Sequence, residues 1–217
     1  MSAMQMTLYT GRRVDPWNLT VNDIDIVAIA HSLSMLCRFG GHTKKFYSVA
    51  QHCVRVASIV PKEDRLEGLL HDATEAYIQD VVRPVKIRLK EYKELEHRVW
   101  MQFAFKYGLP GSFSETVKRA DDASLKSEIR QFLNNPGRDI ELADPYWTNV
   151  EEVDEVHRTL APDEAEAMFL MTYADAIAQR VEFIQKGVVK CGRCIENQCR
   201  PECVFYDKLH ETGRTVN

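Results

Sequence analysis

The sequence lacks several patterns that would assign it to particular classes of protein. No segment approaches the roughly 20 consecutive apolar residues that a membrane-spanning helix needs, and the N-terminal stretch MSAMQMTLYTGRR has no apolar core of a signal peptide. The net charge is only −4, so there is no electrostatic footprint for nucleic acid or an anionic membrane. We therefore expect a cytoplasmic protein that binds neither membranes nor nucleic acids.

Internal repeats, low-complexity runs and sustained strand alternation are also missing, which favours an all-α fold. The 217 residues, 45% of them apolar, suit one domain with a single core. We expect that domain over residues 1–187, with an irregular arm over 1–20 and a separate tail over 188–217.

Apolar periodicity and breaker residues predict where the helices lie. Ser48 and Gln51 have the spacing of a capping box, Gly108 is expected to end a long helix, and Gly187 suits the position after the last one. The expected helices cover about 22–39, 48 to the residues before Pro61, 64–77, the stretch after Pro84 to 107, 114–134 and 162–186.

The sharpest local feature is the pair His71-Asp72 inside the helix expected over 64–77. Aspartate is a poor residue for the middle of a helix, and the apolar neighbours here suggest partial burial, which a carboxylate tolerates only beside a cation or donors. A metal ion would supply that cation. Glu75 falls on the same helix face as His71, where a carboxylate could orient or deprotonate a metal-bound water.

His52 and Asp121, each expected inside another helix, would complete a set of two imidazoles and two carboxylates. Such a set suits a divalent ion such as Mn, Co, Fe or Zn. The spacing alone leaves the alternative open: the histidines could be packed core residues, Asp121 could be a surface charge, and Asp122 competes with it.

Two longer stretches extend these motifs. They are HDATEAYIQDVVRPVK, from His71 to Lys86, and the upstream LSMLCRFGGHTKKFYSVAQH. With the order H…HD…D, they resemble the HD-domain metal-dependent phosphohydrolase superfamily over about residues 8–135. The resemblance is to bacterial 5′-deoxynucleotidases and to phage triphosphohydrolases that act on dATP.

The resemblance implies an HD-domain bundle of about six or seven helices and a role for each matching residue. The metal, which would be Mn, Co, Zn, Fe or Mg, would be held by His52, His71, Asp72 and Asp121. Glu75 would activate or position the attacking water. The residues implied at the substrate are Arg38 at the phosphate, Asp80 at the deoxyribose, and Lys86. Members of this superfamily are often homodimers or higher oligomers, which is the expectation here too.

Three neighbouring residues are ambiguous substrate contacts. Phe39 could stack on a base or fill the core. The basic loop with His42 and Lys45 could reach the outer phosphates of a triphosphate, or could simply be solvated. The function expected from the resemblance is hydrolysis of the phosphate group or groups of 2′-deoxynucleotides, with monophosphate and triphosphate substrates both open.

The C-terminal tail departs from the deoxynucleotidase pattern. Its four thiols, on Cys191, Cys194, Cys199 and Cys203, are close enough to bind one structural zinc ion; free thiols and a redox disulfide are the alternatives. Two other classes of function therefore remain: a zinc knuckle that binds a partner through the tail, and a non-catalytic nucleotide sensor that keeps the HD pocket.

Overall fold

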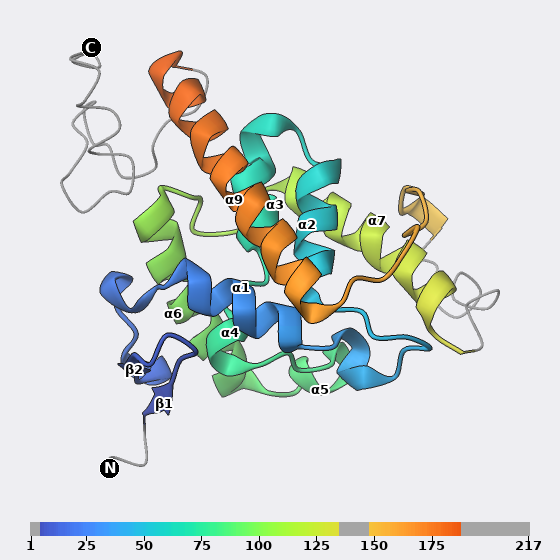
Figure 1. Cartoon of the computed structure of the whole chain (residues 1–217), viewed down its shortest axis with the longest axis horizontal. Helices are drawn as coiled ribbons and strands as arrows, with labels where there is room; N and C mark the ends of the chain where they lie inside the picture. Colours follow the sequence, from blue (N-terminus) through green and yellow to red (C-terminus); the bar gives the residue numbers. More distant parts are fainter. Residues whose placement is uncertain (1–4, 135–147, 188–217) are drawn as a thin grey trace.

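The computed structural model describes residues 5–134 and 148–187, and this part of the chain is mostly helical, which confirms the all-α expectation (Figure 1). A two-stranded antiparallel hairpin, β1 (Met6–Thr7) and β2 (Arg13–Val14), precedes the helices. The helices are α1 (Ile26–Met35), α2 (Val49–Ile59), α3 (Arg65–Leu70), α4 (Glu75–Ile78), α5 (Arg83–Lys86), α6 (Lys90–Tyr107), α7 (Glu115–Phe132) and α9 (Pro162–Gln185). Short 3-10 turns cover Pro16–Asn18, Val21–Asp23, Arg38–Gly41 and Lys62–Asp64.

Side-chain caps set the starts of three helices. Asp25 accepts the first free N–H groups of α1, Ser48 accepts the N–H of Gln51 in α2, and Ser114 accepts that of Val117 in α7. The predicted cap at Ser48 is thus confirmed, but the reciprocal half of the capping box is not formed. The Gln51 side chain instead bonds the backbone of Arg158 and Leu160, before α9.

The first helix is shorter than the predicted range 22–39. It ends at Met35 because the chain then turns into an extended segment, where Cys37 pairs with Ser48 in an isolated bridge. A backbone hydrogen bond of 2.9 Å from Arg38 to Tyr47 closes the loop between them. This loop brings Arg38 beside the start of α2.

The helix predicted over 64–77 is interrupted at the residues that carry its chemistry. It forms α3, then a turn at residues 71–74, then α4. Within the turn, backbone bonds of the tighter i to i+3 type join Leu70 to Ala73, Asp72 to Glu75 and Thr74 to Tyr77. The prediction that His71-Asp72 lies mid-helix is therefore wrong; the pair lies at a break, where aspartate is less costly.

The remaining predicted helices are found with modest changes. The single helix expected after Pro84 is instead two helices: α5, which already begins at Arg83, and α6. Gly108 ends α6 in a left-handed conformation. Gly187, with φ of +71°, follows α9 as predicted. The cysteines of the tail lie outside the described residues.

Helix α9 lies against α1, α2 and α3 and covers the central core (Figure 1). This core is one apolar cluster whose buried residues run from Leu8 in the N-terminal hairpin to Ile184 near the end of α9. None of the helices described is long and apolar enough to cross a membrane. The far side of α2 and α3 packs against α7, and this junction carries the site described next.

Candidate metal centre and substrate cleft

Two histidines and an aspartate bring their ligand atoms together where α2 meets the turn after α3. The Nε2 atoms of His52 and His71 are 3.2 Å apart, and Oδ2 of Asp72 lies 3.6 Å from the first and 3.3 Å from the second. All three ligand atoms lie within 4.8 Å of one another. Imidazole nitrogens and carboxylate oxygens are the donors that first-row divalent metals prefer, so this cluster could hold a metal ion.

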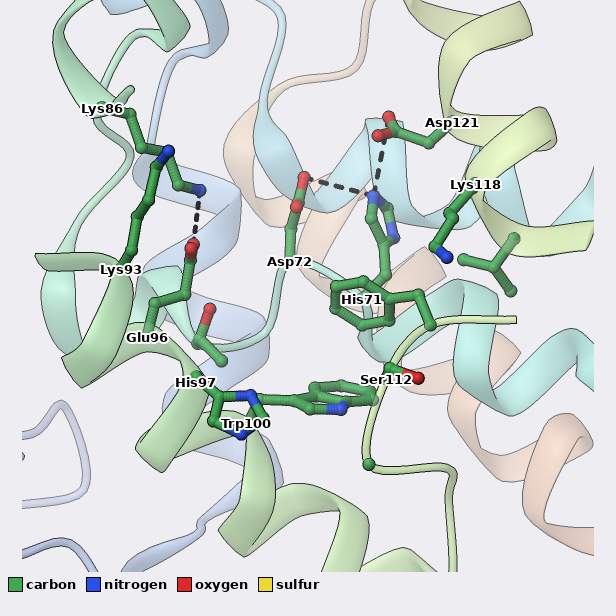
Figure 2. A pocket seen from close by; sticks show the side chains of 14 residues that line it. His71, Asp72, Lys86, Lys93, Glu96, His97, Trp100, Ser112, Lys118 and Asp121 are labelled. Atoms are coloured by element: carbon green, nitrogen blue, oxygen red, sulfur yellow. Dashed lines mark ion pairs between the residues drawn. The ribbon is translucent and has the colours of Figure 1, made fainter. Parts of the chain in front are cut away.

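Asp121, from α7, completes the set of ligands predicted from the sequence. Its Oδ1 lies 3.1 Å from Nε2 of His52 and 3.8 Å from Nε2 of His71 (Figure 2). Asp121 contacts both imidazoles but does not belong to the mutually close triad of His52, His71 and Asp72. Asp122, the competing candidate, lines the neighbouring cavity instead.

Each of the two histidines forms a hydrogen bond through Nδ1, on the side of the ring away from the cluster. These bonds fix the orientation of the rings, so that both Nε2 atoms face the cluster. Nδ1 of His71 lies 2.8 Å from the carbonyl oxygen of Gly68. A carbonyl only accepts, so this Nδ1 carries a proton, and in the neutral ring Nε2 is the atom with a lone pair for a metal. Nδ1 of His52 lies 2.8 Å from Oε1 of Glu128, which orients the second ring in the same way.

Glu128 is the functional residue that the sequence reading missed. It is fully buried on α7 and is a hydrogen-bond acceptor for Tyr47 (2.8 Å), Ser124 (2.8 Å) and Nε of Arg38 (3.0 Å). Burial alone would raise the pKa of Glu128, but His52 and Arg38 outweigh it and lower that pKa to about 2. A usable signal existed: Glu128 follows Asp121 by two helical turns, so both lie on one face of α7.

The pKa values of His52 and His71 indicate that the carboxylates around the two rings favour positive charge at this position. Burial would lower the pKa of His71, but Asp72 and Asp121 outweigh it and hold that pKa well above its usual value. The pKa of His52 is also raised, with Glu128 and Asp121 overcoming the effects of burial and Arg38. Carboxylates that retain protons on two buried imidazoles create a field that equally suits a metal cation.

Glu75 lies at the edge of this cluster, in the first turn of α4. Its side chain is buried, and its Oε2 has no hydrogen-bond partner among the described residues. Burial, with added repulsion from Asp72 and Asp80, raises the pKa of Glu75 well above its usual value. A buried carboxyl oxygen without a partner is costly unless a ligand or water meets it, and a hydrated metal ion would be such a partner.

Arg38 also contacts Asp72. Its Nη1 is 3.4 Å from Oδ2 of Asp72, and the guanidinium lies 5.4 Å from the ring centroid of Phe39. Phe39 has a φ of +57°, an uncommon conformation for a bulky residue. The predicted phosphate arginine is thus held beside the cluster by Glu128 and Asp72.

Two adjoining cavities open from the cluster. One, of about 750 Å³, is lined by Glu75 and by most of the predicted substrate residues: Arg38, Phe39, His42, Asp80 and Lys86. The other, of about 400 Å³, extends between α6 and α7 (Figure 2). Lys45 is exposed and is not among the residues lining either cavity, whereas Asp72, Lys86, Lys93, Lys118 and Asp121 line both.

No family model matches the chain. The chain is 39% identical over 171 residues to the uncharacterized protein YfdR of Escherichia coli K12. The aligned region covers 77% of this chain and 92% of YfdR. It is 35% identical over 138 residues to the uncharacterized protein RCAP_rcc00048 of Rhodobacter capsulatus, covering 57% and 70% of the two chains.

Proposed function

We propose that this chain, which belongs to the same family as YfdR of Escherichia coli, is a metal-dependent phosphohydrolase of the HD type. It would remove phosphate groups from 2′-deoxynucleotides. The observation that carries the proposal is the convergence of two oriented imidazoles and two carboxylates beside Arg38, whose side chain is partly buried, at the junction of two cavities. A metal centre with an arginine beside it suits hydrolysis of a phosphate ester, because both neutralise charge on the phosphoryl oxygens.

His52, His71, Asp72 and Asp121 would hold the divalent metal. When bound, the metal would polarise a phosphoryl oxygen and lower the pKa of a water molecule. Phosphoryl transfer depends mainly on positioning and on neutralising charge at the phosphoryl oxygens, and the remaining roles fall to side chains of the cleft.

Arg38 would bind the phosphate at the metal. Its guanidinium is fixed on one edge by Glu128 and Asp72, so little side-chain entropy remains to be lost when a phosphate oxygen binds. Glu75 would position the attacking water and accept its proton, since its buried Oε2 lacks a partner among the described residues and burial raises its pKa above the usual value.

The larger cavity suits the nucleoside. Phe39, together with Leu125 and Ile129 of α7 and Leu133 just after α7, lines it with apolar surface. A flat, weakly polar base can pack against such a lining. Asp80 lies in the same cavity and could accept a hydrogen bond from the 3′-hydroxyl of a deoxyribose. A 2′-hydroxyl would crowd that contact, which is the proposed basis for selecting deoxynucleotides.

The proposal is tested by incubating the purified protein with dAMP, dATP, AMP and ATP in the presence of Mn²⁺, Co²⁺, Zn²⁺ or Mg²⁺. Phosphorus NMR then identifies phosphate, pyrophosphate or tripolyphosphate as products. Asp72→Asn should abolish hydrolysis, while Asp175→Asn, an exposed change on α9, should leave it unchanged. Absence of hydrolysis with every metal, or full activity in Asp72→Asn, would refute the proposal.

A further inference from the structure

The smaller of the two cavities has no role in the function proposed so far. It shares Asp72, Asp121 and the three lysines Lys86, Lys93 and Lys118 with the larger cavity, so the metal centre lies where the two meet. A substrate whose reacting phosphorus lies at the centre and whose nucleoside fills the larger cavity would leave the smaller one vacant if it ended in one phosphate. The smaller cavity therefore raises the question of what lies beyond the reacting phosphate.

Three ammonium groups reach into this second cavity. Lys86 and Lys93 extend to the same corner of it, from α5 and α6, and Lys118 enters from α7 on the other side (Figure 2). Thr74 and Ser112 also line it. Donors on facing walls are the arrangement that holds an anion from both sides.

The charges of the lining do not neutralise one another. Lys86 forms an ion pair with Glu96, the one carboxylate of this lining besides the two metal ligands. In contrast, within residues 5–134 and 148–187 no carboxylate lies within 4.0 Å of the ammonium groups of Lys93 or Lys118. Lys93 and Lys118 are exposed side chains on the lining of a partly open pocket. With no carboxylate partner among the described residues, their ammonium groups are available to bind an anion.

The basic loop does not compete for this role. Lys44 uses its ammonium group to donate to the carbonyl oxygen of Gln131 at 3.3 Å, and Lys45 lines neither cavity. The positive charge available to a phosphate chain therefore lies on α6 and α7, outside the stretch that suggested a triphosphate from the sequence.

Resting on the function proposed above, we infer that the smaller cavity is the compartment for phosphates beyond the reacting one. The substrates are then deoxynucleoside polyphosphates, and Lys93 and Lys118 bind the outer phosphates. Both lysines contribute to binding of the substrate's phosphate chain, and they make the protein favour polyphosphates over monophosphates. The aromatic floor of the cavity, Trp100 and Phe113, closes it behind those phosphates.

The test measures binding of inorganic tripolyphosphate and of orthophosphate to the full-length, Mn²⁺-loaded protein by calorimetry, at one fixed concentration of free metal. Lys93→Met and Lys118→Met should each weaken tripolyphosphate binding by about ten-fold to a hundred-fold, the usual effect of losing a hydrogen bond to a charged group. They should change orthophosphate binding by less than about two-fold. Lys90→Met, an exposed lysine one turn earlier on α6, is the matched control and should change neither.

Hydrolysis provides the second readout. In Lys93→Met and Lys118→Met, kcat/KM for dATP should fall by the same factor as tripolyphosphate affinity, while kcat/KM for dAMP should not change. Equal losses for the short and long anions, or no loss in either variant, would overturn the inference. So would hydrolysis of dAMP with none of dATP, although the proposed phosphohydrolase function would then stand. Lysine-dependent tripolyphosphate binding without hydrolysis of any nucleotide would support the cavity assignment and refute the enzyme.

Discussion

Nδ1 of His52 lies 2.8 Å from Oε1 of Glu128, a residue 76 positions further along the chain. The same carboxylate accepts a hydrogen bond of 3.0 Å from Nε of Arg38. One buried glutamate thus orients a candidate metal ligand and the candidate phosphate arginine together. Its two contacts couple the metal centre to the substrate cleft through a single side chain.

Glu128→Gln should weaken both functions of that residue. The amide keeps the shape of the side chain but removes the charge that holds His52 and Arg38, so we expect metal affinity to fall about 10-fold to 100-fold, as for other partners of metal-bound histidines. Calorimetric titration of the metal-free protein with Mn²⁺ measures this directly, without reference to activity.

Glu115→Gln, an exposed change in the first turn of the same helix, controls for a general effect on α7. Glu128→Ala should in addition destabilise the fold by about 3–5 kcal/mol, because it leaves a buried cation without its partner. Unchanged Mn²⁺ affinity in Glu128→Gln would show that Glu128 has only a structural role.

Gln79 carries backbone strain next to Asp80. Its φ of 69° and ψ of 158° belong to a region that essentially only glycine occupies, at a cost of about 1–3 kcal/mol. Gln79→Gly should therefore raise the free energy of unfolding by about 1 kcal/mol, the relief of strain being partly offset by a more flexible unfolded chain. Urea denaturation measures the change, and Gln131→Gly, inside α7, is expected to destabilise instead.

If Gln79 also fixes the direction of Asp80, the same variant should lose part of its preference for deoxyribose. The ratio of kcat/KM for dATP to that for ATP then falls in Gln79→Gly. A ratio equal to that of the wild type would mean that Asp80 is positioned by other contacts.

Asp25 should make the stability of α1 depend on pH. Burial would raise the pKa of Asp25, but hydrogen bonds from Thr10 and from the N–H groups of Ala28 and Val27 outweigh it and lower that pKa below its ordinary value. A depressed pKa in the folded state stabilises the protein above pH of about 4 and loses that effect as pH falls through the folded value. Asp25→Ala should thus cost about 1 kcal/mol at pH 7, and the difference from the wild type should shrink below pH of about 4 in urea titrations.

The helical class and most helix ends could be predicted because they depend on local chemistry. Ser48, Ser114 and Gly108 act within one turn of the chain, through caps and a left-handed residue. The break at His71-Asp72 could not be predicted from periodicity, because the apolar pattern continues through it while the backbone bonds tighten to the i to i+3 type.

The candidate ligands could be named from the sequence, but their surroundings could not. Glu128 looks like a surface residue in the sequence, and only its distance to His52 and Tyr47 in three dimensions gives it a role. The same holds for Lys93, which lines the same cavity as Asp121 only because α6 and α7 lie on opposite sides of it (Figure 2). Such relationships depend on tertiary packing between elements far apart in the chain.

Removal of the metal should lower stability, and the effect should depend on pH. Metal binding requires neutral imidazoles, yet the pKa values of His52 and His71 are raised by the carboxylates around them. Below those pKa values protons compete with the metal and are released when it binds. The apparent affinity for Mn²⁺ should therefore rise with pH from 6 to 8.

Bound metal should also stabilise the fold. At a free Mn²⁺ concentration of about 100 times the dissociation constant, the free energy of unfolding should increase by about 2.7 kcal/mol. The increase is measured as a rise in Tm that EDTA reverses. Asp72→Asn should abolish the rise in Tm, and a Mn²⁺ affinity that is the same at pH 6 and pH 8 would exclude the two imidazoles as ligands.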